Sequence, residues 1–345
     1  MSPPTLTVGM PNYNHARFLP DALDALLAQS YRPLEFIVVD DASEDSSVPL
    51  LQDYARRHPW MRVIVHRENQ GAPATLQELL EMAAGDYFFA PAADDLVLPG
   101  LLEKSMALIG RHPEAGLCSA QSYTMDEEGR RNGRWVEQPG GRRRGGYYLS
   151  PAECAAVCWR SMPWFLGNTV FFQRKAFLGL GGYRPELGSF CDGYMHQALA
   201  MSHGACFIPE LLASWRRMPT SYANRTMADA GKARQIREAA LGLMRGPHSR
   251  IFTAEYSRRW ERRWNFSSVR THTVHCAGQL LQGARTLVLP GTISRRMSHA
   301  VATLIVRGAS ASIQFAALCC LIPFDVGRIL RRDLWQMVRH GRYSA

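Results

Sequence analysis

The 345-residue chain has no apolar stretch long enough for a membrane-spanning helix. Crossing a bilayer takes about 20 consecutive apolar residues, and the longest candidate, residues 313–324, is much shorter. The N-terminus has no basic segment followed by an apolar run, so a signal peptide is not expected. These absences predict a cytoplasmic protein that is not integral to the membrane.

Other absences exclude several function classes. The eight cysteines form no C-x-x-C pair, which argues against a zinc ribbon or a thioredoxin-like site. Their neighbours are mostly apolar, so we expect buried, reduced thiols. No G-x-G-x-x-G follows the first predicted strand, which disfavours a Rossmann dehydrogenase. No zinc-finger or RRM pattern is present, so nucleic acid is not an expected partner.

The composition is that of a globular protein, with 46% hydrophobic and 20% charged residues. The net charge of +10 favours anionic partners such as nucleotides, pyrophosphate lipids or an anionic membrane face. Arginine-rich stretches occur at 130–144 and beyond 234. Because such stretches attract phosphate groups, they are consistent with a membrane surface or a nucleotide as a partner.

Strand and helix patterns alternate through the first third of the chain. Compact apolar runs predict strands, and apolar residues at helical spacing predict the segments between them. Strands joined by helices form right-handed βαβ units, so we expect an α/β fold with a Rossmann-like, mostly parallel sheet flanked by helices. The expected strands are 6–10, 34–39, 61–65, 87–90 and 115–120, and the expected helices are 18–29, 46–58, 74–84 and 99–110.

The pattern changes twice further along the chain. Residues 121–149 are polar and rich in Gly and Arg, which is typical of a loop or irregular hairpin. Residues 164–222 return to mixed structure, and the chain beyond about 228 is helical and basic. We therefore expect one domain over 1–225, with halves 1–120 and 121–225, and a basic helical region over 226–345.

Two Asp-Asp pairs follow predicted strands. Asp40 and Asp41 end the apolar run LEFIVV, where a carboxylate is placed to accept hydrogen bonds from a ribose or a base. Asp94 and Asp95 follow the strand at 87–90, and two adjacent carboxylates suit Mg²⁺ or Mn²⁺ bound to phosphate. The alternative for each pair is to cap the helix that follows.

A third acidic residue, Asp192, opens a short helical pattern in the second half of the chain. Transfer to a hydroxyl group requires a base that removes the proton of that hydroxyl. A carboxylate within hydrogen-bond reach of the acceptor would serve. The alternative is an ordinary acidic residue in the first turn of a helix.

Four sequence blocks taken together resemble the inverting glycosyltransferases of family 2, which have the GT-A fold. The resemblance covers roughly residues 5–220. The first three blocks are highly specific in order and spacing, and the fourth is weaker. The blocks read TVGMPNYNHARFLPDALDALLAQSY, LEFIVVDDASEDSS, NQGAPATLQELLEMAAGDYFFAPAADDLVLPGLL and GNTVFFQRKAFLGLGGYRPELGSFCDGYMHQAL.

The resemblance implies a site. Pro11 and Tyr13 would lie along the nucleotide base, and Asp41 would accept a hydrogen bond from the base while Asp40 supports the loop. The pair Asp94 and Asp95 would bind the donor and a divalent metal, Mn²⁺ or Mg²⁺, with Asp94 as the principal ligand. Asp192 would be the catalytic base for attack by the acceptor hydroxyl. Residues 1–120 would then bind the nucleotide, and residues 121–225 the acceptor.

The chain departs from the family pattern in two places. Ala92 replaces the first Asp of the usual Asp-Ala-Asp-Asp sequence, which puts the donor type in doubt and keeps a catalytically silent nucleotide-sugar-binding protein as an alternative. The Q-x-x-R-W sequence of processive synthases is absent, which favours transfer of a single sugar. The resemblance implies a glycan or lipid-linked acceptor in cell-surface polysaccharide or lipopolysaccharide biosynthesis.

Several basic residues have two readings. Arg216 or Arg217 could neutralise a leaving diphosphate, or could be solvated surface residues. The run 142–144 could be a loop that closes over the donor, or a solvated loop. His196 is expected to pack or to lie at the surface rather than to catalyse. The basic C-terminal region could make a peripheral contact with the inner membrane face, or could pack against the catalytic domain.

Overall fold

The computed structural model describes residues 3–135, 139–141, 143–160, 165–218 and 220–265. Its described residues belong to two units, and each is considered by itself. The first unit comprises the chain up to Thr226 together with Gln235–Ser257. The second includes Met227–Arg234 and, among described residues, 258–265.

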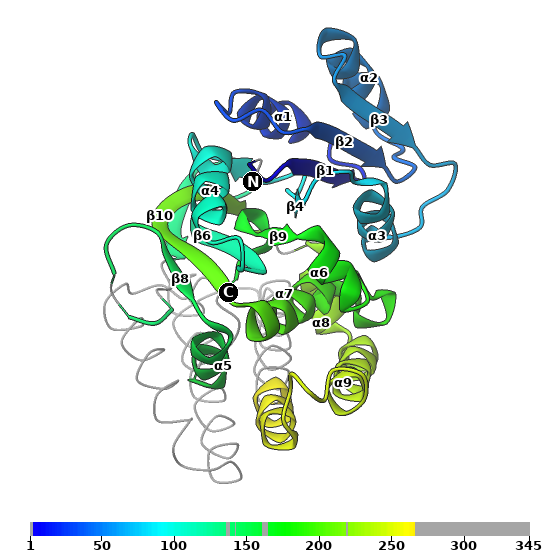
Figure 1. Cartoon of the computed structure of the whole chain (residues 1–345). Helices are drawn as coiled ribbons and strands as arrows, with labels where there is room; N and C mark the ends of the chain where they lie inside the picture. The colour runs from blue at the N-terminus through cyan, green and yellow to red at the C-terminus, as the bar shows by residue number, and fades with distance from the viewer. Residues whose placement is uncertain (1–2, 136–138, 142, 161–164, 219, 266–345) are drawn as a thin grey trace, which may run out of the picture. The chain divides into compact units, whose positions relative to one another are not determined.

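Strands and helices alternate from the start of the first unit, close to the places that the sequence predicts (Figure 1). The helices are amphipathic: in the first, Leu19, Leu23 and Leu26 recur at the helical period and are buried. In chain order the elements are β1 (Leu6–Asn12), α1 (Leu19–Leu27), β2 (Glu35–Asp40), α2 (Ser47–Arg57), β3 (Met61–Val65), α3 (Ala72–Met82), β4 (Tyr87–Phe89), β5 (Leu96–Val97) and α4 (Leu101–Arg111).

The next part of the chain is less regular. The sequence predicted a loop or an irregular hairpin over residues 121–149, and the structure has a hairpin there. β6 and β7 pair antiparallel around a turn at Asp126–Gly129. The elements that follow α4 are β6 (Leu117–Met125), β7 (Arg131–Trp135), β8 (Tyr147–Leu149), α5 (Pro151–Arg160), η1 (Gly167–Thr169), β9 (Phe171–Gln173), α6 (Arg174–Gly179), η2 (Pro185–Phe190), α7 (Cys191–His203), β10 (Ala205–Arg216), α8 (Tyr222–Ala228) and α9 (Ala230–Arg245).

One sheet runs through the unit in the order β3-β2-β1-β4-β9-β6-β10-β5, with β7 beside β6 and β8 beside β10. The predicted parallel pairing holds for β3-β2-β1-β4 and for β6 with β10. The expectation of a mostly parallel sheet does not hold beyond this part, because β9, β7, β8 and β5 all pair antiparallel. These four strands are two to five residues long, too short for a clear hydrophobic period.

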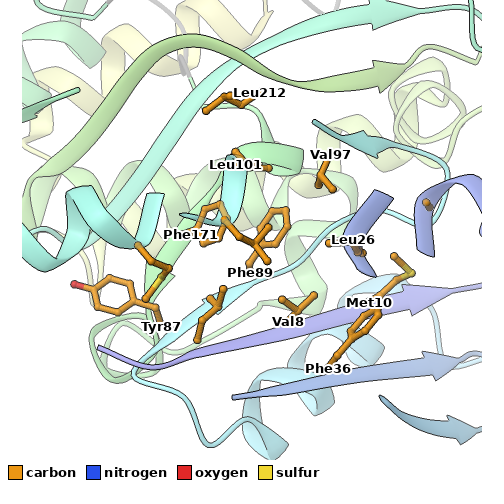
Figure 2. Close-up of a cluster of buried hydrophobic side chains, with 14 of the residues drawn as sticks. Val8, Met10, Leu26, Phe36, Tyr87, Phe89, Val97, Leu101, Phe171 and Leu212 are labelled. Carbon is orange, nitrogen blue, oxygen red and sulfur yellow. The ribbon is translucent and has the colours of Figure 1, made fainter. Parts of the chain in front are cut away.

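The principal core lies between one face of the sheet and α1, α2 and α4 (Figure 2). Phe89 of β4 stacks on Phe171 of β9, with ring centroids 4.3 Å apart. Val8 and Met10 of β1 join the same core, whereas a Cβ at Gly9 would meet Phe88 and Leu79. Because neighbouring strand residues point to opposite faces, α1 and α3 cover opposite sides of β1. This packing on both faces fixes the positions of the strands, and with them the positions of the loops that follow the strands.

The domain boundary expected near residue 225 stays a prediction. The first unit is interrupted after Thr226 and resumes with Gln235–Ser257. Buried side chains of α9, such as Ile236 and Leu243, explain this return to the first unit. The apolar segment 313–324 lies outside the described residues, and no helix in the described part is long and apolar enough to cross a membrane.

The five described cysteines fulfil the expectation of buried thiols. None takes part in a disulfide, and all are buried. Burial raises the pKa of Cys118 to about 12, so its thiol stays protonated at neutral pH. The five described cysteines are Cys118, Cys154, Cys158, Cys191 and Cys206.

Candidate active site

The loops that follow β1 and β2 are joined by hydrogen bonds. The Asn14 side-chain oxygen accepts from the Glu44 backbone N–H at 2.8 Å, and the Ser43 Oγ accepts from the Asn14 N–H at 2.8 Å. Asn14 and Ala42 both have positive φ, 55° and 61°, which the two loops enforce against the usual preference of residues with a side chain. The two loops form one structural element at the carboxyl ends of β1 and β2.

Asp40 is fully buried beneath these loops. Its carboxylate accepts from the Asn12 Nδ2 at 2.7 Å, from the Ser43 N–H at 2.9 Å and from the Ser43 Oγ at 2.8 Å. All three partners belong to β1 or to the loop itself. The geometry fits the supporting role expected for Asp40.

Asp41 is also buried, and three donors bind its carboxylate. Oδ1 accepts from the Gln70 N–H and from His66 Nδ1, and Oδ2 accepts from the Gly71 N–H, each at 2.8 Å. Burial opposes the charge, but these hydrogen bonds outweigh it and lower the pKa of Asp41 below its usual value. Asp41 is therefore a firmly ionised acceptor.

Sequence reasoning missed His66, which lies directly after β3. Its two ring nitrogens contact Asp41 and Glu78, at 2.8 Å and 2.7 Å. The available signal was positional: β3 is parallel to β2, so the residue after β3 lies beside the residue after β2. A histidine at that place is next to an acidic pair by topology alone.

Pro11 and Tyr13 flank the buried Asn12 at the end of β1. Pro11 is half-buried and lies opposite Val39 of β2, while the Tyr13 ring is 43% exposed. An exposed aromatic ring beside the loop of Asp40 and Asp41 is placed to lie against a planar base. Their expected role along the nucleotide base stays a prediction.

Asp94 and Asp95 lie in the turn between β4 and β5, five residues beyond the end of β4 rather than directly at it. Asp95 is buried, and its Oδ1 accepts from the Arg216 backbone N–H at 2.7 Å. Burial and the neighbouring charge of Asp94 together raise the pKa of Asp95 well above its usual value. Two adjacent carboxylates therefore repel each other here.

Neither acidic pair caps a helix. The cap residue of α2 is Ser46, and that of α4 is Gly100, and no side chain caps either helix. The capping alternative for the two pairs is therefore not what the structure shows. Their carboxylates are held by other partners.

Arg216 holds the Asp94–Asp95 turn through hydrogen bonds from its backbone and its side chain. It is 4% exposed, and its guanidinium donates to the backbone carbonyls of Asp94, Asp126 and Glu127, with Nε to Asp94 O at 2.8 Å. The guanidinium also lies 4.4 Å from the Phe18 ring centroid. Its hydrogen bonds to carbonyls join the end of β10, the β6–β7 turn and the acidic turn. The solvated-surface alternative for Arg216 is wrong.

Asp192 lies in the first turn of α7 and is half-buried. Its Oδ1 accepts from the Gly193 N–H at 2.6 Å, and a Cβ at Gly167 would come within 2.9 Å of its Oδ2. Burial raises the pKa of Asp192, and the Gly193 N–H offsets only part of this effect. A carboxylate with a raised pKa is a stronger base.

The η1 turn connects Asp192 to the other acidic group. Gly167 lies against Asp192, and the next residue, Asn168, is hydrogen-bonded to Asp95 and donates to Ser122 Oγ at 3.4 Å. Asp95 and Asp192, 97 positions apart in the sequence, are thus separated in space by two adjacent residues. The structure brings these two predicted groups together.

Asp41 joins this arrangement through β1. Asp40 bonds to Asn12 at the end of β1, and Phe18, a few residues later, stacks on Arg216, which holds the Asp94 carbonyl. The described hydrogen bonds include none between Asp41 and Asp94 themselves. These contacts connect the end of β2, through Asp40, to the acidic turn, and the convergence of Asp41, Asp94 and Asp192 on a single cleft stays a prediction.

The acidic turn suits a divalent cation that also binds phosphate. Among the described residues no group of three or more His, Cys, Asp and Glu surrounds a point, so the protein alone offers no closed metal site. Mg²⁺ and Mn²⁺ in phosphate sites commonly use one or two carboxylates and complete their shell with phosphate and water oxygens. Burial, and after it the neighbouring charge of Asp94, raise the pKa of Asp95, so a bound cation would favour the ionised form of this carboxyl.

The remaining candidates lie away from this edge or are engaged elsewhere. His196 is buried against Phe165, Phe172 and Phe177, and burial lowers its pKa to about 3, which supports the expected packing role. Arg217 lies over the Trp215 ring, 5.6 Å from its centroid. Arg143 pairs with Glu153, while Arg142 lies outside the described residues.

Comparison with known proteins gives consistent results. Residues 7–175 match the profile of glycosyl transferase family 2. The protein named "Putative glycosyltransferase EpsE" of Bacillus subtilis is 30% identical over 187 residues, which cover 53% of this chain and 61% of that protein. An uncharacterised protein of Mycobacterium bovis is 26% identical over 252 residues, 69% of this chain and 68% of its own length. The chain thus spans less than two thirds of EpsE.

Solved structures share the fold at low sequence identity. TarS of S. aureus superposes with a TM-score of 0.55 and 15% identity, over 78% of this chain and 43% of that one. The mannosyltransferase PcManGT of Pyrobaculum calidifontis, in complex with GDP-Man and Mn²⁺, has a TM-score of 0.54 and 20% identity over 90% and 81%. The profile match, the similarity to EpsE and the shared fold agree, and together they support a glycosyl transferase family 2 domain over residues 7–175.

Proposed function

We propose that this protein is an inverting glycosyltransferase that moves a single sugar from a nucleotide-sugar donor to an acceptor hydroxyl. One observation carries the proposal: Asn168 and Gly167 join the repelling pair Asp94–Asp95 to Asp192. The acidic turn proposed to bind the diphosphate and Asp192, the proposed catalytic base, then lie side by side. Such adjacency is what a direct displacement at the anomeric carbon requires.

The donor nucleotide would bind at the ends of β1 and β2. The exposed Tyr13 ring and Pro11 flank the base, and Asp41 accepts a hydrogen bond from it. A carboxylate has about four lone-pair positions, and three on Asp41 are already occupied by protein donors. One position, on Oδ2, is left for an N–H of the base.

The diphosphate would lie at the acidic turn, where Asp94 and Asp95 would hold a divalent cation. When bound, that cation supplies positive charge against the departing diphosphate. The protein's own part is to hold the turn rigid: the Arg216 backbone N–H fixes Asp95, and its guanidinium fixes the Asp94 carbonyl. Asp94, the less buried of the two, remains the principal ligand.

Asp192 would accept the proton of the acceptor hydroxyl. As that proton moves to the Asp192 carboxylate, the hydroxyl oxygen forms a bond to the anomeric carbon, and the bond from that carbon to the diphosphate oxygen breaks. The nucleotide diphosphate leaves with the electron pair. A single displacement with one base inverts the anomeric configuration, and the raised pKa of Asp192 makes its carboxylate a better proton acceptor at neutral pH.

The donor class in the proposal rests on relatives. TarS has been crystallised with UDP-GlcNAc and PcManGT with GDP-Man and Mn²⁺. By analogy we propose a hexosyl donor. The acceptor that we propose is a glycan or lipid-linked molecule of the cell envelope, as in polysaccharide or lipopolysaccharide biosynthesis, and it rests on the sequence resemblance alone. Cytoplasmic location with peripheral membrane contact is part of this proposal, and the C-terminal segment that would make the contact lies outside the described residues.

Thermal stabilisation by UDP-, GDP- and dTDP-sugars, each with and without Mn²⁺, tests the donor assignment, because a ligand of the native state raises the melting temperature. Stabilisation by one nucleotide class that is lost in EDTA is the expected result. Failure of every nucleotide sugar to stabilise the chain would overturn the proposal.

The alternative, a catalytically silent nucleotide-sugar-binding protein, is favoured by Ala92, which replaces an acidic residue of the family pattern. Turnover separates the two functions. Transfer or donor hydrolysis that disappears in both Asp94→Ala and Asp192→Ala would exclude the silent protein. Donor binding without turnover in the wild-type chain, with acceptors of several classes, would favour it.

A further inference from the structure

His66 occupies a confined place behind the nucleotide edge. Its backbone N–H donates to the Asp40 carbonyl at 2.9 Å, which continues the parallel pairing of β2 and β3. Its side chain is 7% exposed. The ring lies between Asp41 after β2 and Glu78 on α3, with Nδ1 2.8 Å from Asp41 and Nε2 2.7 Å from Glu78.

The two contacts define the charge of the ring. An ionised carboxylate can only accept hydrogen bonds, so a ring nitrogen at this distance from it must carry a proton. Both nitrogens of His66 face carboxylates, and both can be protonated together only in the imidazolium form. Burial opposes that charge, but the bonds to Asp41 and Glu78 outweigh it and raise the pKa of His66 above its usual value.

The charged groups around the ring are few. Asp41 faces it from the end of β2 and Glu78 from α3, while Arg67 and Glu68 follow it in its own loop and are exposed. The protonated cluster of His66, Asp41 and Glu78 carries a net charge of one negative unit. Loss of the imidazolium proton leaves two, with a nitrogen lone pair turned toward a carboxylate oxygen.

The segment after β3 binds Asp41 from three points. His66 begins it, and the N–H groups of Gln70 and Gly71 end it. Residues 66–71 thus surround the Asp41 carboxylate. When His66 is protonated its ring attracts this carboxylate, and when His66 is neutral a nitrogen lone pair can face a carboxylate oxygen and repel it. The single acceptor position left on Asp41 therefore depends on all three contacts being formed, that of His66 included.

We propose that His66 is a positioning residue for the donor nucleotide. As an imidazolium bridging Asp41 and Glu78, His66 fixes the Asp41 carboxylate so that one acceptor position remains for the nucleotide base. Donor affinity therefore falls as the pH rises and His66 loses its proton. This inference rests on the proposed function and adds to it a residue that touches neither donor nor acceptor.

Two substitutions separate this role from a structural one. His66→Gln keeps a donor toward one carboxylate but does not titrate. Glu78→Gln removes the second carboxylate, so that a neutral imidazole fits, donating to Asp41 from Nδ1 and accepting from the amide through Nε2. Both variants should therefore bind the donor without the pH dependence of the wild-type chain.

The probe is UDP, GDP or dTDP with Mg²⁺, whichever binds the wild-type chain. The measurement is calorimetry from about pH 6 to about pH 9, a range that brackets a raised histidine pKa. The wild-type dissociation constant should rise about tenfold across the range, the factor of one charge-assisted hydrogen bond. It should stay within about twofold in His66→Gln and Glu78→Gln. His66→Leu should bind weakly at every pH.

Two outcomes overturn the inference while leaving the glycosyltransferase proposal standing. One is wild-type binding whose pH dependence is unchanged in His66→Gln and Glu78→Gln. The other is an imidazole signal, assigned by NMR as the one missing from His66→Gln, that titrates below the ordinary histidine value. If none of UDP, GDP and dTDP binds the wild-type chain at any pH, the proposed function fails first, and the donor-positioning role fails with it.

Discussion

The two Asp-Asp pairs of this chain are alike in sequence and opposite in electrostatics. Asp41, in the pair after β2, is surrounded by three donors, and its pKa is lowered. Asp95, in the pair after β4, is buried beside the charge of Asp94, and its pKa is raised. At Asp41 the hydrogen bonds outweigh the effect of burial, whereas at Asp95 burial and the charge of Asp94 outweigh the contacts with Arg216 and Asn168.

The difference shows what each pair is suited for. A carboxylate that is already compensated can accept one further hydrogen bond from a neutral base, but has little to gain from a metal ion. A repelling pair gains most from a cation. The same dipeptide at two strand ends thus serves two kinds of ligand, and the neighbouring chain segments make the distinction. Substitutions that affect one pair and spare the other test it.

The largest effect is expected at the third acid, Asp192, which belongs to neither pair. Asp192→Asn removes the proton acceptor and keeps the shape of the side chain, so kcat should fall by about 10²- to 10⁴-fold. Donor affinity, measured by calorimetry, should be unchanged, because both pairs are intact. Activity within a few-fold of the wild type would show that Asp192 is not the base.

Next in size is the response of donor affinity to metal. Asp94→Asn should weaken donor binding by about 10- to 100-fold in the presence of Mn²⁺, to the level that the wild-type chain shows in EDTA. Asp41→Asn should weaken binding by a similar factor both with and without metal, because its loss is that of a base contact. Calorimetry with and without EDTA provides the measurement.

These two variants serve as controls for each other. If Asp41→Asn abolishes the metal dependence, or if Asp94→Asn leaves it intact, the assignment of the two pairs to base and diphosphate is reversed. A donor affinity that EDTA does not change in the wild-type chain would remove the metal from the proposal altogether.

The same two substitutions should change stability in opposite directions. Asp41→Asn leaves buried N–H donors facing an amide and should lower the free energy of unfolding by about 1–3 kcal/mol. Asp94→Asn relieves repulsion with Asp95 and, in EDTA, should leave that free energy unchanged or raise it by up to about 1 kcal/mol. Urea unfolding would measure both, and destabilisation by both variants alike would contradict the contrast drawn here.

The smallest effect concerns acid pH. The pKa of Asp192 is raised, so activity should fall as the pH drops through that value, while the base takes up its proton. The pKa of Asp41 is lowered, so its contribution to stability is present above the ordinary aspartate pKa and is lost only as the pH falls through the lowered value.

Between these two pH values the chain should be folded and inactive. A pH–rate profile of kcat compared with circular dichroism of the same samples would show this interval, and activity should return when the pH is raised again. Coincident loss of activity and of folded structure would mean that the acid limb reports unfolding and not protonation of Asp192.

Much of the first half could be predicted from sequence because its patterns are local. The strand at 61–65 was predicted with the bounds that β3 has, and α1–α4 lie within two residues or so of their expected ends. Helices of nine to eleven residues display a full apolar period. β5 and β9, of two and three residues, display none, and their antiparallel pairing was therefore missed.

The candidate site was predictable in its acidic members and not in their partners. Asp41, the pair Asp94 and Asp95, and Asp192 were chosen from strand ends and a helix start, which are features of the local sequence. His66 and Arg216 acquire their roles through contacts with residues 25 and about 120 positions away. No local pattern reports such contacts, because they depend on which strands become neighbours.

The sequence by itself determined where the acidic groups stand, after two strands and at the start of a helix, because apolar periods and short polar motifs are features of the local sequence. Only the tertiary structure decided how each acid is charged. A pKa depends on burial and on the donors and charges within a few ångströms, and these come from β3, α3, η1 and β10, segments that folding alone brings to the acids.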